Sequence, residues 1–308
     1  MIAEGLRPKL VLVGAKGMLA SAVLPLARGR FEVTPLDLPD FDVTDRGQVL
    51  ARVAAHAPEV ILNCAAFTDV DGAESECELA GRVNGEGPGF LAEAARRTGA
   101  ILVHISSDYV FGGSKRAPYA EHDPTGPRSA YGRSKLRGEE AILGSGLARF
   151  LLVRTSWLYG PNGRNFVETI LRLASEREEL RVVSDQVGSP TNTGDLAQAI
   201  LTLLELECEG RAPAGVYHFS GEGACSWFEF ACAIVAEARG RGAELRVRDV
   251  HAVATQEYPA AAERPAYSVL AKDKYRRVTG CPVPHWQDAL TRYFDGRGAG
   301  VAGARRGA

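Results

Sequence analysis

Short apolar runs alternate with longer segments of mixed character through the first half of this 308-residue chain. Short runs of apolar and β-branched residues are typical of buried strands, and they predict strands near residues 9–13, 31–36, 59–63, 101–106 and 150–155. The intervening segments predict helices near residues 17–29, 44–55, 72–98 and 131–144, the third of them broken around 85–89. Repeated strand–helix units favour a doubly wound parallel Rossmann sheet of the α/β class, with all its strands ending at one edge.

The pattern loosens after residue 156. It predicts helices near 165–177, 195–207 and 226–239, a strand at 216–219, and a turn-rich loop at 185–191. These elements predict a smaller C-terminal α/β lobe at 156–294, beside a larger sheet domain at 1–155 to which some later segments return. Residues 295–308 are rich in glycine, alanine and arginine and hold too little apolar mass to fold, so they predict a disordered tail.

Composition narrows the class of protein without pointing to a reaction. Hydrophobic residues make up 45% of the chain and charged residues 24%, which suits a soluble globular protein with an ample core. The formal net charge of -2 gives no general attraction to nucleic acid or to an anionic membrane, and no apolar run is long enough to span one. The first residues lack the order of a secretory signal, and the six cysteines and six histidines are dispersed. The sequence therefore predicts a cytoplasmic, reduced protein without a metal site.

A glycine-rich turn follows the first predicted strand. Gly14, Gly17 and Ala20 occupy the three small positions of the turn that opens the first predicted helix. Glycines let the backbone approach a pyrophosphate closely, and the N-terminus of the helix offers N–H groups to it. Asp37 ends the second predicted strand, where an acid can bond the ribose hydroxyls of a dinucleotide; the alternative is a solvated acid at a strand end. This order of elements favours the binding of a dinucleotide, NAD(P), by the domain at 1–155.

Three polar residues further along the chain carry the candidate chemistry. Ser107 ends a buried strand, at the edge where open α/β sheets place their active sites. Tyr131 and Lys135 stand four residues apart, so a helix places them on one face, where the ammonium is expected to lower the pKa of the phenol. Taken singly, the serine could only terminate its strand, and the pair could belong to a solvated helix face. Their occurrence together with the glycine turn favours catalysis.

These residues resemble the extended short-chain dehydrogenase/reductases, which combine a glycine turn, a strand-end hydroxyl and Tyr-x-x-x-Lys. Within them, the chain resembles the dTDP-4-dehydrorhamnose reductases. The matching segments, in order along the chain, are residues 63–74, 106–111, 131–135, 154–159, 165–166, 184–191 and 264–265. The runs at 108–111 and 185–191 are more specific than the glycine turn. Two departures, Ser107 where the family usually has threonine and Ala20 in place of the third glycine, remove no required group.

The resemblance implies a role for each catalytic residue. Tyr131 would protonate the substrate oxygen as hydride arrives at the carbonyl carbon, Ser107 would position the carbonyl, and Lys135 would hold the nicotinamide ribose. The cofactor, NADH or NADPH, would be bound by Gly14, Lys16, Gly17, Met18, Leu19, Asp37, Asp42, Val43, Ala65, Ala66, Thr68, Tyr131 and Lys135. Asp42 and Val43 are expected to follow a short additional strand and to contact the adenine. NADH is expected to be accepted at least as well as NADPH, because Asp37 would repel a 2′-phosphate and no basic residue follows it closely.

The resemblance also implies a substrate, dTDP-4-dehydro-β-L-rhamnose, whose 4-keto group would be reduced to give dTDP-β-L-rhamnose. The residues expected to contact it are Ser107, Asp108, Tyr131, Trp157, Asn165 and Arg264. Trp157 would stack on the sugar or the base, and Arg264 would clamp the diphosphate, because a guanidinium can bond phosphate with two N–H groups. Asp69, Asp71 and Glu74 are interpreted as surface or helix-capping acids.

Several alternatives stay open. Another nucleotide-sugar 4-ketoreductase or an epimerase of the same superfamily would carry the same motifs. A non-catalytic regulatory subunit of the same fold is a further interpretation, against which the intact Ser107, Tyr131 and Lys135 argue. No nucleic-acid or membrane partner is expected, and the chain is expected to be a monomer or a homodimer. Some family members dimerise through Mg²⁺, but no acidic cluster in the sequence assigns such a site here.

Overall fold

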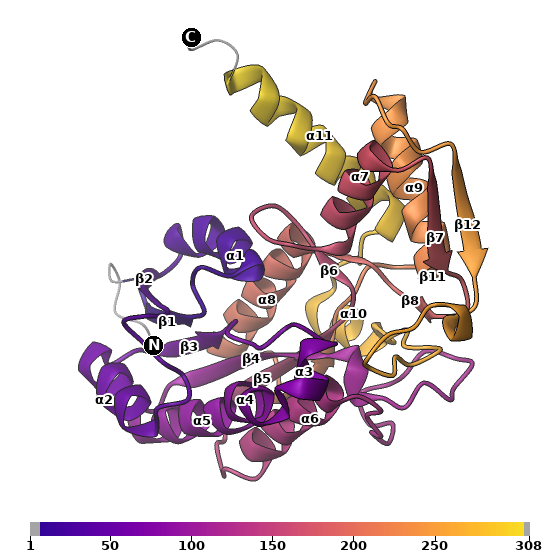
Figure 1. Ribbon diagram of the computed structural model, residues 1–308. Helices are drawn as coiled ribbons and strands as arrows, with labels where there is room; N and C mark the ends of the chain where they lie inside the picture. The colour runs from indigo at the N-terminus through magenta and orange to yellow at the C-terminus, as the bar shows by residue number, and fades with distance from the viewer. Residues whose placement is uncertain (1–6, 305–308) are drawn as a thin grey trace.

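A six-stranded parallel sheet lies at the centre of the computed structural model, which describes residues 7–304, with side chains as far as residue 297 (Figure 1). In spatial order its strands are β10 (Gly215–His218), β5 (Phe150–Thr155), β4 (Ile101–Ser107), β3 (Val60–Asn63), β1 (Lys9–Val13) and β2 (Glu32–Leu36). The order reverses between β1 and β3, because the chain leaves β1 toward one edge and then builds the sheet toward the other. Open α/β sheets bind ligands in the crevice at such a point.

Helices cover both faces of the sheet. Successive residues of each strand point to opposite sides, so each strand contributes apolar side chains to a core on either face. Leu10 and Leu12 of β1 join a core with the first helical layer, whereas Val11 and Val13 join a core with the second. The first layer consists of α1 (Met18–Arg28) and α8 (Thr193–Cys208), and the second of α2 (Arg46–His56), α5 (Gly87–Thr98) and α6 (Ala130–Leu143). Both layers hold the strand ends, and hence the candidate residues, in fixed positions.

The C-terminal lobe has an apolar core of its own, built around Ile170, Phe230 and Trp286. Its main elements are α7 (Phe166–Glu176), β7 (Glu179–Val183), α9 (Trp227–Gly240), β12 (Asp249–Val253) and α11 (Trp286–Ala304). Three small sheets pair β7 with β12, β6 (Leu158–Tyr159) with β9 (Thr191–Asn192), and β8 (Val187–Gly188) with β11 (Cys225–Ser226). The short helix α10 (Asp273–Thr279) packs beside β10.

The doubly wound α/β fold predicted from the sequence is confirmed. Two later segments return to the sheet domain, since β10 pairs with β5 and α8 packs on α1. The predicted third helix consists of α3 (Gly72–Ser75), α4 (Cys77–Gly81) and a π-helical turn that continues into α5, so it breaks after Ser75 and not around 85–89. The short strand expected before Asp42 is wrong, because residues 37–45 form a loop.

Helix α11 continues to Ala304, through part of the segment that composition predicts to be disordered from residue 295. The last four residues of that segment, 305–308, lie outside the described residues, as do residues 1–6. Within the part of the chain that the structure describes, no helix combines the length and the apolar character needed to cross a membrane.

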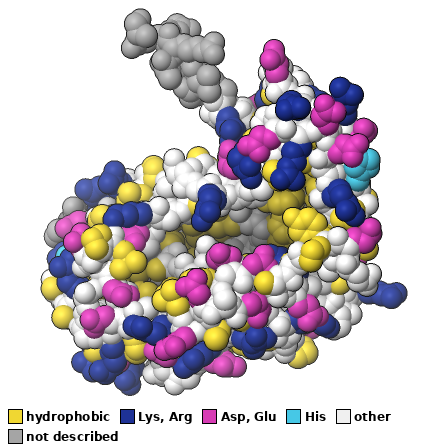
Figure 2. Space-filling model, in the orientation of Figure 1, with side chains coloured by type: hydrophobic (Ala, Val, Ile, Leu, Met, Phe, Trp, Pro, Cys, Tyr) yellow, Lys and Arg dark blue, Asp and Glu magenta, His cyan; other side chains and the backbone are white. Residues whose placement is uncertain are grey.

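A cleft separates the sheet domain from the C-terminal lobe. Figure 2 shows it as a hollow with hydrophobic side chains on its walls. The chain passes directly from the end of β5 through β6 into the lobe. Because parallel strands end at one edge of a sheet, the carboxyl ends of β1, β3, β4 and β5 lie at the border of this cleft.

Candidate active site

The turn between β1 and α1 lies in direct contact with the end of β3. Gly14 has a φ of +74°, and a Cβ added there would lie 2.5 Å from the Ala65 nitrogen, so only glycine fits. Gly17 is the N-cap of α1 and has no side chain to bond the first helical N–H groups. An uncovered backbone and a helix N-terminus at the point where the strand order reverses suit a pyrophosphate. The turn therefore fits the predicted dinucleotide.

Asp37 lies at the end of β2, beside this turn. Its carboxylate accepts hydrogen bonds from the backbone N–H groups of Lys16 and Leu38, each at 2.7 Å. The Lys16 ammonium donates to the Leu38 carbonyl oxygen, so a cation lies close to Asp37 although none follows it closely in the sequence. A cation at this position can pair with the 2′-phosphate of NADPH. Asp37 is therefore not the only charged group that can decide between NADH and NADPH.

The remaining predicted cofactor residues differ in their exposure. Met18, Asp42, Ala65 and Ala66 are half-buried and Thr68 is exposed, so their side chains can reach a ligand. Leu19 and Val43 are instead only 6% and 7% exposed and belong to the cores on the two faces of the sheet. Their side chains pack the domain, and only their backbone groups remain for a cofactor contact.

Ser107 and Tyr131 are brought together where β4 ends and α6 begins. Ser107 caps a short 3₁₀ turn and accepts a hydrogen bond from the Tyr109 N–H at 3.1 Å. The first turn of α6 packs so closely on this segment that a Cβ on Gly132 would lie 2.3 Å from the Tyr109 carbonyl oxygen. Gly132 thus allows Tyr131 to lie beside Ser107, whose hydroxyl is close enough to the phenol to affect its pKa.

Lys135 is one turn further along α6 and is buried. Its ammonium donates to the Ile105 carbonyl oxygen of β4 at 2.7 Å. Burial lowers the pKa of Lys135 to about 8, and the negative charge of Glu139 opposes this shift. The ammonium form is therefore the main form at neutral pH.

Tyr131 contradicts one prediction made from the sequence. Burial raises the pKa of its phenol to about 12, the neighbouring Ser107 hydroxyl opposes the rise, and the charge of Asp108 adds to it. The prediction that Lys135 lowers the pKa of Tyr131 is wrong for this structure, because desolvation of the phenolate dominates. A phenol that stays protonated at neutral pH keeps the proton that a general acid must donate.

A buried ion pair lies behind Lys135, and no motif in the sequence indicated it. Arg154 of β5 donates to both oxygens of the Glu139 carboxylate, at 2.9 and 2.6 Å, and the two side chains are 5% and 1% exposed. Ser106 donates to the same carboxylate at 2.5 Å. Glu139 follows Lys135 by four residues, and this spacing is the signal that could have linked it to the Tyr131 face of the helix. The pair fixes α6 against β5 and so helps to place Lys135.

Arg264, in the segment that follows β12, reaches the connection between β3 and α3. Its Nη1 and Nη2 donate to the Asp71 carboxylate at 3.1 and 2.7 Å, and Nη1 also donates to the Ala262 carbonyl oxygen at 3.3 Å. The hydrogen bonds from Arg264 lower the pKa of Asp71, which the sequence suggested to be only a surface or capping acid. Among the described residues, none accepts a hydrogen bond from Nε of Arg264, and the Tyr109 hydroxyl lies beside the guanidinium. The Arg264 side chain is 22% exposed, so its Nε edge can still meet a phosphate.

The other predicted substrate residues, Trp157, Asn165 and Asp108, differ in whether their side chains are free to contact a substrate. Trp157 stacks on Trp227 with ring centroids 3.4 Å apart, so the site contains two stacked indoles, of which the motifs indicated one. The side chain of Asn165 caps α7 and also donates to the carbonyl oxygens of Gly160 and Gly163, which leaves its amide without a free group for the predicted substrate bond. Asp108 is only 2% exposed and lies behind Ser107, so the structure does not support the direct substrate contact predicted for it.

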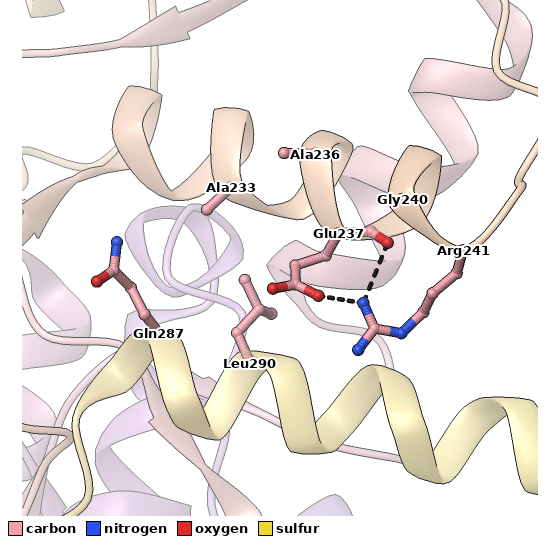
Figure 3. Close-up of a pocket in the computed structure, with 7 residues that line it drawn as sticks. All are labelled: Ala233, Ala236, Glu237, Gly240, Arg241, Gln287 and Leu290. Carbon is pink, nitrogen blue, oxygen red and sulfur yellow. Dashed lines mark hydrogen bonds and ion pairs between the residues drawn. The ribbon is translucent and has the colours of Figure 1, made fainter.

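A separate open groove of about 470 Å³ lies between α9 and α11 (Figure 3). Its lining consists of Ala233, Ala236, Glu237, Gly240, Arg241, Gln287 and Leu290, none of them a residue of the candidate active site. Arg241 is already paired with Glu237 and Asp295. Within the described part of the chain, no three His, Cys, Asp or Glu side chains are placed to hold a metal ion, so no residue is assigned to Mg²⁺.

The family model described as the RmlD substrate binding domain matches residues 8–297 of the chain. The chain belongs to this family. The resemblance inferred from the motifs is therefore confirmed, and it covers both the sheet domain and the C-terminal lobe.

Proteins of similar sequence extend the RmlD family assignment. A dTDP-4-dehydrorhamnose reductase from Streptomyces griseus is 43% identical over 290 residues, which cover 94% of this chain and 93% of that protein. A dTDP-4-keto-6-deoxy-D-glucose reductase from Streptomyces niveus is 41% identical, with 92% of this chain and 96% of that protein covered. Both proteins therefore align with this RmlD-family chain over nearly their whole length.

A solved structure shows the same fold. The dTDP-4-dehydrorhamnose reductase from Bacillus anthracis, crystallised in complex with NADP, is 38% identical to this RmlD-family chain. The two superpose with a TM-score of 0.85, over 94% of this chain and 99% of the other.

Proposed function

We propose that the protein is an NAD(P)H-dependent oxidoreductase that reduces the 4-keto group of dTDP-4-dehydro-β-L-rhamnose to give dTDP-β-L-rhamnose. The observation that carries this proposal is the placement of Ser107, Tyr131 and Lys135 at the cleft edge of the sheet. Ser107 ends β4, and the glycine turn follows β1, with β3 between the two strands. Relatives over 40% identical along nearly the full chain are dTDP-4-dehydrorhamnose reductases.

The side chains can perform the proton half of this reduction. A bound nicotinamide supplies the hydride that reaches C4 of the sugar. Tyr131 Oη transfers its proton to the former keto oxygen, and the Ser107 hydroxyl orients that oxygen beside the phenol. Lys135, protonated and held by Ile105, places a positive charge on the α6 side of the site, where it favours the phenolate left behind. A solvent proton must later restore the phenol.

The substrate is proposed to lie between the two parts of the molecule. The cofactor residues belong to the sheet domain, whereas Trp157, Trp227 and Arg264 belong to segments after β5. A dTDP-sugar carries a diphosphate that needs a cation, and the glycine turn is already assigned to the dinucleotide. The Nε edge of Arg264 is the candidate for that cation.

Arg264→Ala is expected to raise the KM for the sugar nucleotide and to leave the cofactor Kd nearly unchanged. The loss of a charge-assisted hydrogen bond costs about 1.5–3 kcal/mol, which is roughly 10- to 150-fold. Calorimetric titration of both ligands measures the two effects separately. Arg181→Ala is the matched control, because Arg181 pairs with Glu257 and both are exposed. Weakened cofactor binding, or no change in either affinity, would contradict the role of Arg264.

The choice between NADH and NADPH is proposed to depend on Asp37 and Lys16 together. Lys16→Ala should lower kcat/KM for NADPH by roughly 10- to 150-fold, because a charge-assisted bond to the 2′-phosphate is lost, and should leave NADH nearly unaffected. Asp37→Ala should act in the opposite sense and penalise NADH. Steady-state kinetics with both cofactors tests this. Equal effects of Lys16→Ala on the two would show that the ammonium does not reach the 2′-phosphate.

Turnover with a panel of dTDP-4-keto sugars tests the proposed function itself. Consumption of one reduced cofactor per sugar, with dTDP-β-L-rhamnose identified by NMR, is the expected result. An epimerase would change the sugar without net use of cofactor, and a regulatory subunit would turn over none of the panel. A different 4-ketoreductase is the second candidate, because the Streptomyces niveus relative at 41% identity reduces a dTDP-4-keto-6-deoxyhexose of another configuration. A higher kcat/KM for that sugar would favour this second candidate.

Three further proposals follow from the sequence alone. The reaction is assigned to the cytoplasm, the chain is expected to act as a monomer or a homodimer, and no nucleic-acid or membrane partner is required. The oligomeric state is measurable by sedimentation with and without Mg²⁺.

A further inference from the structure

The carboxyl group of Asp108 occupies a position that the proposed mechanism leaves without a role. The side chain is 2% exposed, at the start of the 3₁₀ turn that follows β4. Its Oδ1 accepts a hydrogen bond from Ser107 Oγ at 3.0 Å. Its Oδ2 is buried and has no hydrogen-bond partner among the described residues. An ionised carboxylate with an unsatisfied buried oxygen is costly, so the site favours the neutral acid.

Among the residues that the structure describes, no cation pairs with the Asp108 carboxyl. Tyr109 on the same turn and Tyr131 of α6 both face it as neutral phenols. Ser268, from the segment before α10, lies near enough to favour the ionised form. The guanidinium of Arg264 lies beside Tyr109 and is paired with Asp71. Burial dominates this balance and raises the pKa of Asp108 to about 7.

The protonation state of Asp108 decides where the single hydrogen of the Ser107 hydroxyl can point. One lone pair of Ser107 Oγ already accepts the Tyr109 N–H. When Asp108 is ionised, Oδ1 can only accept, so it takes the Ser107 hydrogen away from the reacting oxygen. When Asp108 is protonated, it can donate to the second lone pair, and the Ser107 hydrogen is free to point at the substrate carbonyl.

We propose that Asp108, as a buried neutral acid, is a positioning residue that orients the Ser107 hydroxyl toward the substrate oxygen. Asp108 needs no contact with the substrate for this role, in agreement with its burial. No bond to the substrate forms or breaks at Asp108. The proposal rests on the reductase function proposed above, because it concerns the orientation of the keto group during reduction.

The experiment is the pH dependence of kcat for wild type and for Asp108→Asn, with the keto sugar and a saturating reduced cofactor. Wild-type kcat should fall on the alkaline side, by about 10-fold per pH unit once a single ionisation is complete. Asp108→Asn cannot ionise, and its amide can donate to Ser107 Oγ at every pH. Its alkaline fall should therefore begin only at the higher pH where Lys135 loses its proton, with little change in KM. Asp195→Asn is the matched control. Burial also raises the pKa of Asp195, which pairs with Arg292 outside the site, so this variant should keep the wild-type profile.

A double-mutant cycle that combines Asp108→Asn with Ser107→Ala provides a second test of the proposal. If Asp108 acts through Ser107, then Asp108→Asn should have no further effect on the profile once the hydroxyl is removed. An alkaline fall that begins at the same pH in Asp108→Asn as in wild type would assign the whole fall to another group, such as Lys135, and would overturn the proposal. Independent, additive effects of the two substitutions would overturn it as well. Wild type that reduces no member of the sugar panel would instead reject the proposed function.

Discussion

Tyr131→Phe is expected to lower kcat for the reduction by about 10²–10⁴-fold, the usual contribution of a general acid. The phenol is the proton donor that the geometry brings beside Ser107, and its pKa of about 12 keeps it protonated at neutral pH. Phenylalanine retains the ring, and therefore the edge-to-face contact with Tyr109 at 5.7 Å, so the fold should be unaffected. Steady-state kinetics measures kcat, and a fluorescence titration measures the Kd of the cofactor, which should change little.

The matched control for this substitution is Tyr258→Phe. Tyr258 is 52% exposed and lies outside the candidate active site, so loss of its hydroxyl should leave kcat unchanged. If Tyr131→Phe keeps kcat within about twofold of wild type, Tyr131 is not the acid, since general acids contribute far more than that. A large rise in the cofactor Kd would assign Tyr131 to binding instead.

Arg154→Leu is expected to lower the free energy of unfolding by about 3–5 kcal/mol, because it leaves the Glu139 carboxylate buried without its cation. The guanidinium makes two hydrogen bonds to Glu139, and Ser106 alone would remain to bond the carboxylate. Leucine fills part of the same volume, so the loss measures mainly the uncompensated charge. Urea denaturation followed by circular dichroism gives the free energy of unfolding of both proteins.

Arg172→Leu provides the contrast on the surface. Arg172 pairs with Glu176 at 2.9 Å, but the two side chains are 60% and 52% exposed, so the change should stay within about 1 kcal/mol. Removal of both charges in an Arg154→Leu/Glu139→Met double variant should recover much of the stability lost in the single variant. If Arg154→Leu costs no more than Arg172→Leu, the buried pair does not hold α6 against the sheet.

Local patterns in the sequence determined most of the elements and pointed to the candidate catalytic residues. Apolar runs marked β1 to β5, because buried parallel strands need apolar side chains on both faces. The glycine turn was recognisable because the backbone at Gly14 needs a positive φ and approaches Ala65 too closely for a side chain. Ser107 stood out as a hydroxyl at a strand end, and Tyr131 and Lys135 stood out by their helical spacing. Their occurrence together with the glycine turn, and the family resemblance, suggested that they act at one site.

Tertiary structure decided which charged and aromatic groups meet. Lys16 beside Asp37, Asp71 with Arg264, and Trp157 on Trp227 are each pairs separated along the chain, and no local period connects their members. The return of β10 to the sheet next to β5 is a similar case, because a short apolar strand fits either part of the molecule until its neighbours are known.

Burial decided the direction of the pKa shifts of Tyr131 and Asp108, which the sequence could not give. The spacing of Tyr131 and Lys135 predicted a lowered phenol pKa, but the cost of desolvating the phenolate dominates and raises that pKa. The same cost makes Asp108 a candidate neutral acid instead of a substrate ligand. The identity of each side chain follows from the sequence, whereas its solvation depends on every element packed around it, and that packing exists only in the folded molecule.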